Sequence, residues 1–325
     1  MSLRVSVVIA VYNGAPYLRK ALDSALNQTY PPHEVIVIDD GSMDETPKTL
    51  ESYGRRIVMR RFENAGVATA MNRGLELAGG DAVAFLDHDD VWFRNKLEKQ
   101  VEALLRYPEA GFVCCDYAVR PPGGGGRMIK HFPTMRSLKG LNAADPFLKD
   151  SLRYLIQENF VGTSSAVMIR REVIQKVGLF NKNYRISGDY DYWLRCVAVA
   201  DFVAVPEVLF YKRTHATNLS GDRTRTLLEQ RDIMVSFFKS HRDCFEKSRV
   251  VDSYRREIAA LHFVLGNLCF EKKQFAEAFS FYGAALRCRR SVSNLLVFLW
   301  TVTKKSVRLL TFDIISRKSL LRKGA

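Results

Sequence analysis

Short apolar runs alternate with helical patterns along the first ninety or so residues of the chain. Residues 5–11, 35–38, 57–62 and 83–86 have the length of strands, and the segments that separate them repeat apolar side chains at helical spacing. Strands that are apolar along most of their length, rather than alternating, are typical of a sheet that is covered on both faces. Short connections between strand and helix then predict an α/β fold, with a doubly wound, mostly parallel sheet and right-handed crossovers.

Carboxylates follow two of these strands at the point where each strand ends. Asp39 and Asp40 come after one run, and Asp87, Asp89 and Asp90 come after another. Open parallel sheets bind ligands at the carboxyl ends of their strands. Crowded carboxylates repel one another, and a divalent cation such as Mg²⁺ or Mn²⁺ offsets that repulsion. An acidic turn that caps the following helix is the alternative interpretation.

The pattern changes after residue 221, where strand signals stop and long helical patterns begin. We therefore predict an α/β domain over residues 1–221 and a helical region over residues 222–325. Within the latter, residues 265–286 have the pattern of a single helical hairpin, which is not a repeat array. The tail, residues 291–323, mixes Trp and Phe with Lys and Arg, as a helix at a membrane surface does. A helix docked on the protein's own core, with its basic face in water, is the alternative.

The charge and the motifs narrow the classes of partner and function. A net charge of +14 favours acidic partners: nucleotides, nucleic acid or an anionic membrane. The basic tail lacks the pattern of a nucleic-acid-binding element, and neither a dinucleotide-binding fingerprint nor a phosphate-binding P-loop occurs. The six cysteines have no metal-site spacing, and no signal-peptide or membrane-spanning pattern is present. We predict a cytoplasmic protein, with peripheral contact at the inner face of the plasma membrane as an open alternative.

Three stretches together resemble a known family. Residues 5–46, residues 64–90 and residues 187–220 are similar to family 2 glycosyltransferases of the GT-A fold. The resemblance implies an inverting, metal-dependent enzyme that moves a sugar from a nucleotide-diphosphate donor, with a UDP-sugar favoured, to a hydroxyl group. The acceptor would be a glycan, a lipid-linked glycan or another glycoconjugate, as in polysaccharide biosynthesis. By the same resemblance, residues 1–110 would bind the nucleotide and residues 111–221 the acceptor.

The resemblance also implies roles for the matching residues of the donor site. The aspartate that meets the nucleotide base, usually uracil, corresponds to Asp39. Asp87, Asp89 and His215 correspond to the residues that hold Mn²⁺ or Mg²⁺. Many relatives carry Arg where this chain has Met71. The residues expected to contact the nucleotide or the donor are Ala10, Tyr12, Asn13, Asp39, Asp40, Asn64, Gly66, Asn72, Asp87 and Arg213.

The third stretch would supply the catalytic base and the acceptor side. An attacking hydroxyl must lose its proton, which calls for a positioned carboxylate, and Asp189 matches the family's base. Relatives place a Glu before this base, whereas this chain has Gly188. Asp191 and Trp193 match the positions that follow, and we expect them on the acceptor side.

Two other functions stay open from the sequence. A nucleotidyltransferase would also combine a doubly wound sheet, a metal and a nucleotide, but it needs a basic phosphate-activating loop after the first strand. Residues 11–20 offer little of such a loop. A non-catalytic relative that binds nucleotide or membrane is suggested by the departures at Met71 and Gly188.

Overall fold

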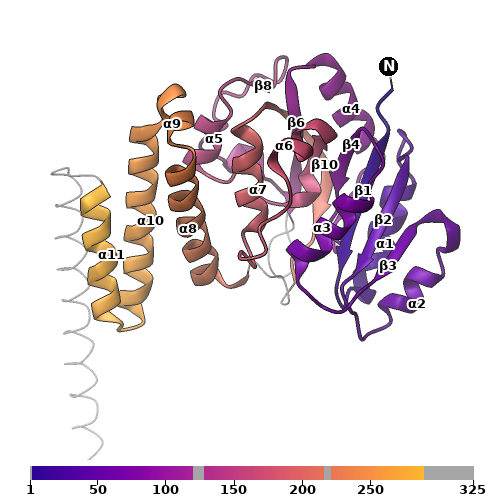
Figure 1. The fold of residues 1–325 in the computed structure, drawn as a ribbon, viewed down its shortest axis with the longest axis horizontal. Helices are drawn as coiled ribbons and strands as arrows, with labels where there is room; N and C mark the ends of the chain where they lie inside the picture. The colour runs from indigo at the N-terminus through magenta and orange to yellow at the C-terminus, as the bar shows by residue number, and fades with distance from the viewer. Residues whose placement is uncertain (1, 120–127, 216–220, 289–325) are drawn as a thin grey trace, which may run out of the picture. The chain divides into compact units, whose positions relative to one another are not determined.

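The computed structural model describes residues 2–119, 128–215 and 221–288 (Figure 1). Contacts between Cα atoms divide the chain into two compact units, Met1–Ser253 and Tyr254–Ala325. Two helices, α8 (Arg223–Ser240) and α9 (Arg242–Lys247), lie within the first unit. This unit therefore extends past residue 221, where the strand signals in the sequence stop.

The first unit is built on one mixed sheet. Among the described residues, ten strands form this sheet in the order β3-β2-β1-β4-β9-β6-β10-β5, with β7 paired to β6 and β8 to β10. β1 to β4 pair in parallel, whereas β9 runs antiparallel between β4 and β6. The doubly wound, mostly parallel sheet expected from the sequence is thus confirmed, with a reversal at β9. The strands are β1 (Val5–Val11), β2 (Glu34–Asp39), β3 (Val58–Arg61), β4 (Ala82–Phe85), β5 (Val91–Trp92), β6 (Ala110–Val119), β7 (Ile129–Lys130), β8 (Phe147–Leu148), β9 (Val167–Arg170) and β10 (Asp201–Lys212).

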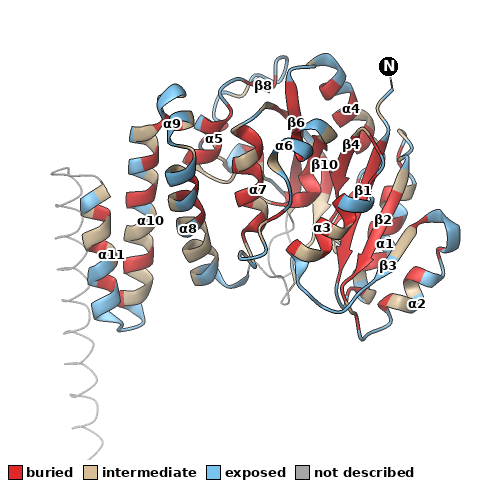
Figure 2. Ribbon diagram, in the orientation of Figure 1, coloured by how far each residue is buried: buried red, intermediate tan, exposed pale blue. Residues whose placement is uncertain are grey.

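Helices cover the sheet and bury its strands. α3 packs on β1 and β2, α4 packs on β6 and β10, and α6 packs on β9. Every residue of β1 and β4 is buried, which explains their uninterrupted apolar sequences (Figure 2). α3 approaches β1 so closely that a Cβ atom at Gly74 would lie 2.3 Å from Val8 Cγ1. The helices of this unit that precede α8 are α1 (Ala15–Leu26), α2 (Thr46–Glu51), α3 (Val67–Leu77), α4 (Lys96–Arg106), α5 (Leu152–Gln157), α6 (Arg171–Val177) and α7 (Gly188–Val197).

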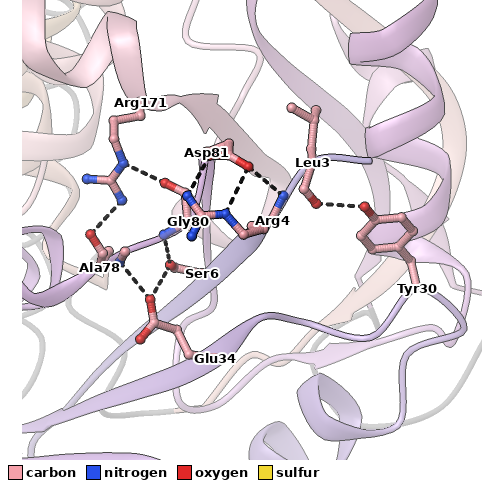
Figure 3. Close-up of polar contacts among 10 residues, drawn as sticks. Leu3, Arg4, Ser6, Tyr30, Glu34, Ala78, Gly80, Asp81 and Arg171 are labelled. Atoms are coloured by element: carbon pink, nitrogen blue, oxygen red, sulfur yellow. Dashed lines mark hydrogen bonds and ion pairs between the residues drawn. The ribbon is translucent and has the colours of Figure 1, made fainter. Parts of the chain in front are cut away.

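Polar contacts fasten the edge of the sheet at which β1 and β4 begin (Figure 3). The guanidinium of Arg4 pairs with Asp81 at 2.9 Å. Ser6 Oγ accepts a hydrogen bond from the backbone N–H of Gly80 at 2.9 Å, and the guanidinium of Arg171 donates to the Gly80 carbonyl. These side chains are engaged with one another and with the backbone, so this edge is closed by the protein's own groups. The opposite edge, where the parallel strands end, carries Asp39, Asp40, Asp87, Asp89 and Asp90.

The second unit contains a pair of helices. α10 (Val251–Glu271) begins just before this unit, and α11 (Phe275–Cys288) follows it. The two helices bury Phe270, Ala278 and Tyr282 together. A Cβ atom at Gly266 would lie 2.6 Å from the Tyr282 ring, so glycine permits this close approach. The helical hairpin expected over residues 265–286 is therefore confirmed.

One expectation falls on a part of the chain that the structure does not describe. The basic tail at residues 291–323 lies outside the described residues. Within residues 2–119, 128–215 and 221–288, each helix is too short or too polar to traverse a lipid bilayer.

Candidate active site

The turns that follow β1, β2 and β4 meet at the carboxyl edge of the sheet. Asn13, in the left-handed region with φ 51°, accepts a hydrogen bond from Met43 N at 2.8 Å, and its own N–H donates to Ser42 Oγ at 2.9 Å. A Cβ atom at Gly14 would lie 2.5 Å from His88 Cδ2, so the first turn also touches the turn after β4. Three segments that are distant in sequence therefore form one surface.

Asp39 is a buried carboxylate with one incompletely satisfied oxygen. Its Oδ1 accepts a hydrogen bond from Ser42 N at 2.9 Å. Its Oδ2 lies 3.3 Å from Arg61 Nε but accepts no hydrogen bond from any described residue. Because a buried oxygen without a hydrogen-bond partner is costly, this atom is suited to accept an N–H group from a ligand.

Asp40 organises the loop that leads into α3. Its carboxylate accepts hydrogen bonds from the backbone N–H groups of Ala65 at 3.0 Å and Gly66 at 2.8 Å. The guanidinium of Arg73 lies 3.4 Å from Asp40 Oδ1 and 4.1 Å from the centre of the Phe62 ring. A guanidinium therefore reaches this part of the site from position 73, although position 71 is a methionine.

The turn after β4 is joined to the segment after β10. His215 Nε2 lies 2.8 Å from Asp89 Oδ2, and the imidazole stacks on Tyr17 with ring centres 4.6 Å apart. The backbone N–H of Arg213 donates to Asp90 Oδ1 at 3.1 Å, and its guanidinium lies 4.8 Å from the Tyr17 ring centre. An acid, an imidazole and a guanidinium are thereby brought together from segments more than a hundred residues apart.

The carboxylates of the β4 turn perturb one another. Burial and the charge of Asp89 raise the pKa of Asp87, whose Oδ2 accepts a hydrogen bond from Thr163 Oγ1 at 2.6 Å. Burial and the charges of Asp87 and Asp89 raise the pKa of Asp90 well above its usual range. A divalent cation would relieve this repulsion, so the chemistry of the donor set fits Mg²⁺ or Mn²⁺. Among the residues with described positions, no set of three or more His, Cys, Asp or Glu side chains already has metal-site spacing.

Asp189 lies in the first turn of α7 and is electrostatically connected to the same acids. Burial raises the pKa of Asp189 to about 6, against a hydrogen bond from Tyr190 N at 2.7 Å. The charge of Asp87 adds to this rise, and the charge of Lys212 opposes it. A carboxylate that titrates close to neutral pH can accept a proton during a reaction.

The family is decided by comparison with known proteins. The model of glycosyl transferase family 2 matches residues 6–178. The chain belongs to glycosyl transferase family 2. An uncharacterized glycosyltransferase of Rickettsia prowazekii is 34% identical over 236 residues, which are 72% of this chain and 71% of that protein. The putative teichuronic acid biosynthesis glycosyltransferase TuaG of Bacillus subtilis is 44% identical over 105 residues, 31% of this chain and 42% of TuaG.

Solved structures confirm the fold of this family 2 glycosyltransferase. S. aureus TarS 1–349, in complex with UDP-GlcNAc, matches 88% of this chain and 81% of its own with a TM-score of 0.67 and 17% identity. The mannosyltransferase PcManGT of Pyrobaculum calidifontis, in complex with GDP-Man and Mn²⁺, matches 95% of this chain and 81% of its own. Its TM-score is 0.59 and its identity is 20%. The GT-A fold class is thus confirmed, and membership of the family excludes the nucleotidyltransferase alternative.

Asn72 of the glycosyltransferase is buried and bonds to the backbone of Phe180. Its side-chain amide donates to the Phe180 carbonyl at 3.0 Å and accepts from Phe180 N at 2.7 Å. The residue therefore holds the segment after α6 in place. Of the other residues expected around the donor, Tyr12, Asn13, Asn64 and Gly66 are exposed, whereas Ala10, Asp39 and Asp40 are buried.

Trp193 and Asp191 take part in the packing of α7. Trp193 is fully buried and contacts Phe85 and Phe180, so in this structure it packs in the core, and its place on the acceptor side stays a prediction. Asp191 is buried and forms an ion pair with Arg195 at 2.9 Å. Helical periodicity explains this ion pair, because positions 191 and 195 share one face of a helix.

Several residues that contact the candidate site of the transferase belong to no motif that could be recognised in the sequence. Lys212 lies at the end of β10, where its ammonium donates to the Gly162 carbonyl at 3.2 Å. Its positive charge partly offsets the rise in the pKa of Asp87, Asp90 and Asp189. Its position beside Arg213 was the only hint in the sequence. Tyr17, Arg73 and Thr163 likewise act through contacts made across the fold.

Proposed function

We propose that this family 2 transferase moves a sugar from a nucleotide-diphosphate donor, most favourably a UDP-sugar, to a hydroxyl of a glycan, lipid-linked or other glycoconjugate acceptor. The reaction inverts the anomeric configuration. The observation that carries the proposal is the meeting of two groups at one sheet edge. The contact between Asp89 and His215 supports a cation site at this edge. The charge of Asp87 contributes to the raised pKa of Asp189, about 6, which supports a proton acceptor close to that site. The complexes of TarS with UDP-GlcNAc and of PcManGT with GDP-Man support a nucleotide-sugar donor.

The nucleotide binds over the ends of β1 and β2 in this proposal. Asp39 Oδ2, which accepts no hydrogen bond from a described residue, takes the N–H of the base. The exposed Tyr12 ring, 45% accessible, offers a flat face for the nucleotide. Asp40 shapes the loop at Asn64 and Gly66 by binding its backbone N–H groups. The remaining donor contacts come from Ala10, Asn13 and Arg213.

Asp89 and His215 would hold Mn²⁺ or Mg²⁺, with Asp87 beside them, and diphosphate and water oxygens would complete the coordination. When bound, the ion supplies electrostatic stabilisation to the departing diphosphate. Arg213, stacked over Tyr17, contributes a further positive charge toward phosphate oxygens.

Asp189 acts as the general base of the transfer. Its carboxylate oxygen takes the proton of the acceptor hydroxyl while the hydroxyl oxygen bonds to the anomeric carbon. The bond from that carbon to the diphosphate oxygen breaks on the opposite side, which inverts the configuration. Burial of Asp189 serves this step because a base with a pKa near 6 is a stronger proton acceptor than an ordinary aspartate.

Calorimetric titration with UDP, GDP and dTDP, each with and without Mn²⁺, tests the donor site. We expect one diphosphate to bind far better with the metal, and Asp89→Ala to weaken that binding by about tenfold or more, as removal of a metal ligand does. Asp232→Ala is the matched control, because Asp232 is an exposed residue paired with its neighbour Arg231. Binding that ignores both the metal and Asp89 would instead favour a non-catalytic nucleotide-binding protein.

Lys212→Met is expected to move the pH dependence of transfer. The Lys212 ammonium lowers the pKa of Asp189, so its removal raises that pKa, and the rise in kcat/KM with pH shifts to more alkaline pH. Lys99→Met removes a half-buried lysine that pairs with Glu102 and should leave the profile unchanged. An identical profile in Lys212→Met would contradict an electrostatic role for this lysine.

A further inference from the structure

Glu229 of α8 binds the segment that leads into α7. Its Oε2 accepts hydrogen bonds from the backbone N–H groups of Ile186 at 2.8 Å and Ser187 at 2.9 Å. Its Oε1 accepts from Arg185 N at 3.2 Å and lies 3.3 Å from Arg225 Nε. One carboxylate thus engages three consecutive backbone donors and one guanidinium.

These contacts hold the start of the helix that carries the base. Ser187 is the N-cap of α7, and its own side chain makes no capping hydrogen bond. Asp189 follows two residues later, in the first turn. The direction in which Asp189 points therefore depends on how the 185–187 backbone is held, and among the described contacts a carboxylate from α8 holds it. α7 and α8 also pack against each other.

Gly188, next to the base, has no side chain that could hold the 185–187 backbone. Gly188 precedes Asp189, and a Cβ atom there would lie 3.7 Å from Tyr184 Cβ and 3.8 Å from the Asn181 carbonyl oxygen. Both are ordinary van der Waals distances, so a Cβ atom would fit at this position without displacing its neighbours. The negative charge beside the base segment comes from Glu229, which is distant in sequence.

The side chain of Glu229 is well suited to a fixed position. It is only 13% exposed. Burial by itself would raise its pKa, but the hydrogen bonds from Ser187, Ile186 and Arg185 together lower it. Hydrogen bonds to a charged acceptor are shorter and stronger than neutral ones. Such bonds restrain the backbone more firmly than a neutral side chain would.

We propose that Glu229 is a positioning residue for catalysis, whose carboxylate fixes the 185–187 backbone and thereby the orientation of Asp189 toward the acceptor hydroxyl. This inference rests on the proposed role of Asp189 as the base. Glu229 acts on the geometry of the base and not on its pKa. That pKa is set by burial, by the hydrogen bond from Tyr190 N and by the charges of Asp87 and Lys212. Its loss should therefore lower kcat without changing the pH at which activity rises.

The test compares Glu229→Gln with the matched control Glu246→Gln. Glu246 forms the same kind of pair, with Arg242 one helical turn earlier on α9, at 3.0 Å. With the donor found by calorimetry, we expect Glu229→Gln to lower kcat by about tenfold to a hundredfold, as a misplaced catalytic group does. The affinity for the nucleoside diphosphate and the pH profile should match those of the wild type. Glu246→Gln should leave kcat unchanged.

Two further measurements separate positioning from a general structural role. Glu229→Gln should cause no further loss in an Asp189→Asn background, because the two residues act in one step. Hydrogen exchange should become faster at residues 185–187 and stay unchanged in the sheet. If Glu229→Gln does not fold, Glu229→Asp keeps the charge on a shorter side chain and should give an intermediate loss of kcat.

Specific results would overturn the inference. An unchanged kcat in Glu229→Gln, or a loss that adds fully to that of Asp189→Asn, would remove the positioning role. If the wild-type protein transfers no sugar from any donor tested, the proposed function fails, and hydrogen exchange then decides about Glu229 separately. Unchanged exchange at residues 185–187 in Glu229→Gln would show that the carboxylate does not hold this segment.

Discussion

Asp189→Asn is expected to lower kcat for sugar transfer by about a hundredfold to ten-thousandfold, the usual contribution of a general base. The amide has nearly the same shape as the carboxylate but does not take a proton from the acceptor hydroxyl. The affinity for the nucleoside diphosphate should stay close to that of the wild type, because in the proposed mechanism Asp189 receives the acceptor's proton and other residues make the donor contacts. A variant that keeps more than a tenth of the wild-type kcat would assign the base to another residue.

The pH dependence of the wild-type enzyme gives an independent test of the same residue. The pKa of Asp189 is raised to about 6, and the base works only when it is ionised. We therefore expect kcat/KM to fall as the pH drops through about 6. Asp191→Asn is the matched control on the same helix: it breaks the ion pair with Arg195 but should leave this fall in place.

Asp189→Asn should also make the protein more stable at alkaline pH. A carboxyl group whose pKa is raised in the folded state favours folding while it is protonated, and this contribution is lost as the pH rises from about 4 to about 6. The asparagine variant has no such loss. Its free energy of unfolding at pH 8 should exceed that of the wild type by roughly 2–3 kcal/mol, given about 1.4 kcal/mol for each pKa unit. Denaturant titrations at pH 8 measure this difference, and a less stable variant would contradict the raised pKa of Asp189.

The sequence predicted those parts of the fold that depend on local pattern. The run at residues 5–11 coincides with β1, and the run at residues 83–86 overlaps β4. The place of β9 between β4 and β6 was not predicted, because strand pairing is a non-local property that a short apolar run does not encode. The register of β10 against β6, which shifts between Val205 and Val208, was not predicted for the same reason.

In the candidate site, as in the fold, the sequence predicted the features that depend on local pattern. Carboxylates at strand ends were recognisable because parallel strands bring their ends to one edge, and the Asp89–His215 contact agrees with that expectation. Residues that act through long-range contacts were missed. Glu229 contacts a backbone segment more than forty residues away, and Lys212 affects acids from two separate stretches. Asn72 and Trp193 match positions in the family pattern, and in this structure Asn72 bonds to the backbone of Phe180 while Trp193 packs in the core.

Trp193→Ala is expected to lower the free energy of unfolding by about 3–5 kcal/mol, the usual cost of removing a large buried aromatic side chain. The ring is fully buried, and its centre lies 6.1 Å from that of Phe85 in β4 and 5.7 Å from that of Tyr192. Removing it leaves a cavity between α7 and the sheet that these neighbours cannot fill without moving. Denaturant-induced unfolding of the variant and the wild type measures the loss.

Trp193→Phe separates packing from recognition of the acceptor. The Trp193 Nε1–H is buried without a hydrogen-bond partner among the described residues, so phenylalanine removes an unsatisfied donor and keeps most of the apolar contact. Trp92 is the matched control, because its Nε1–H donates to the Ser165 carbonyl at 3.1 Å. Trp92→Phe leaves that carbonyl without its donor and should therefore cost more stability than Trp193→Phe. If Trp193→Phe instead raised the KM for the acceptor at unchanged stability, the indole would contact the acceptor, and α7 would have to move to expose it.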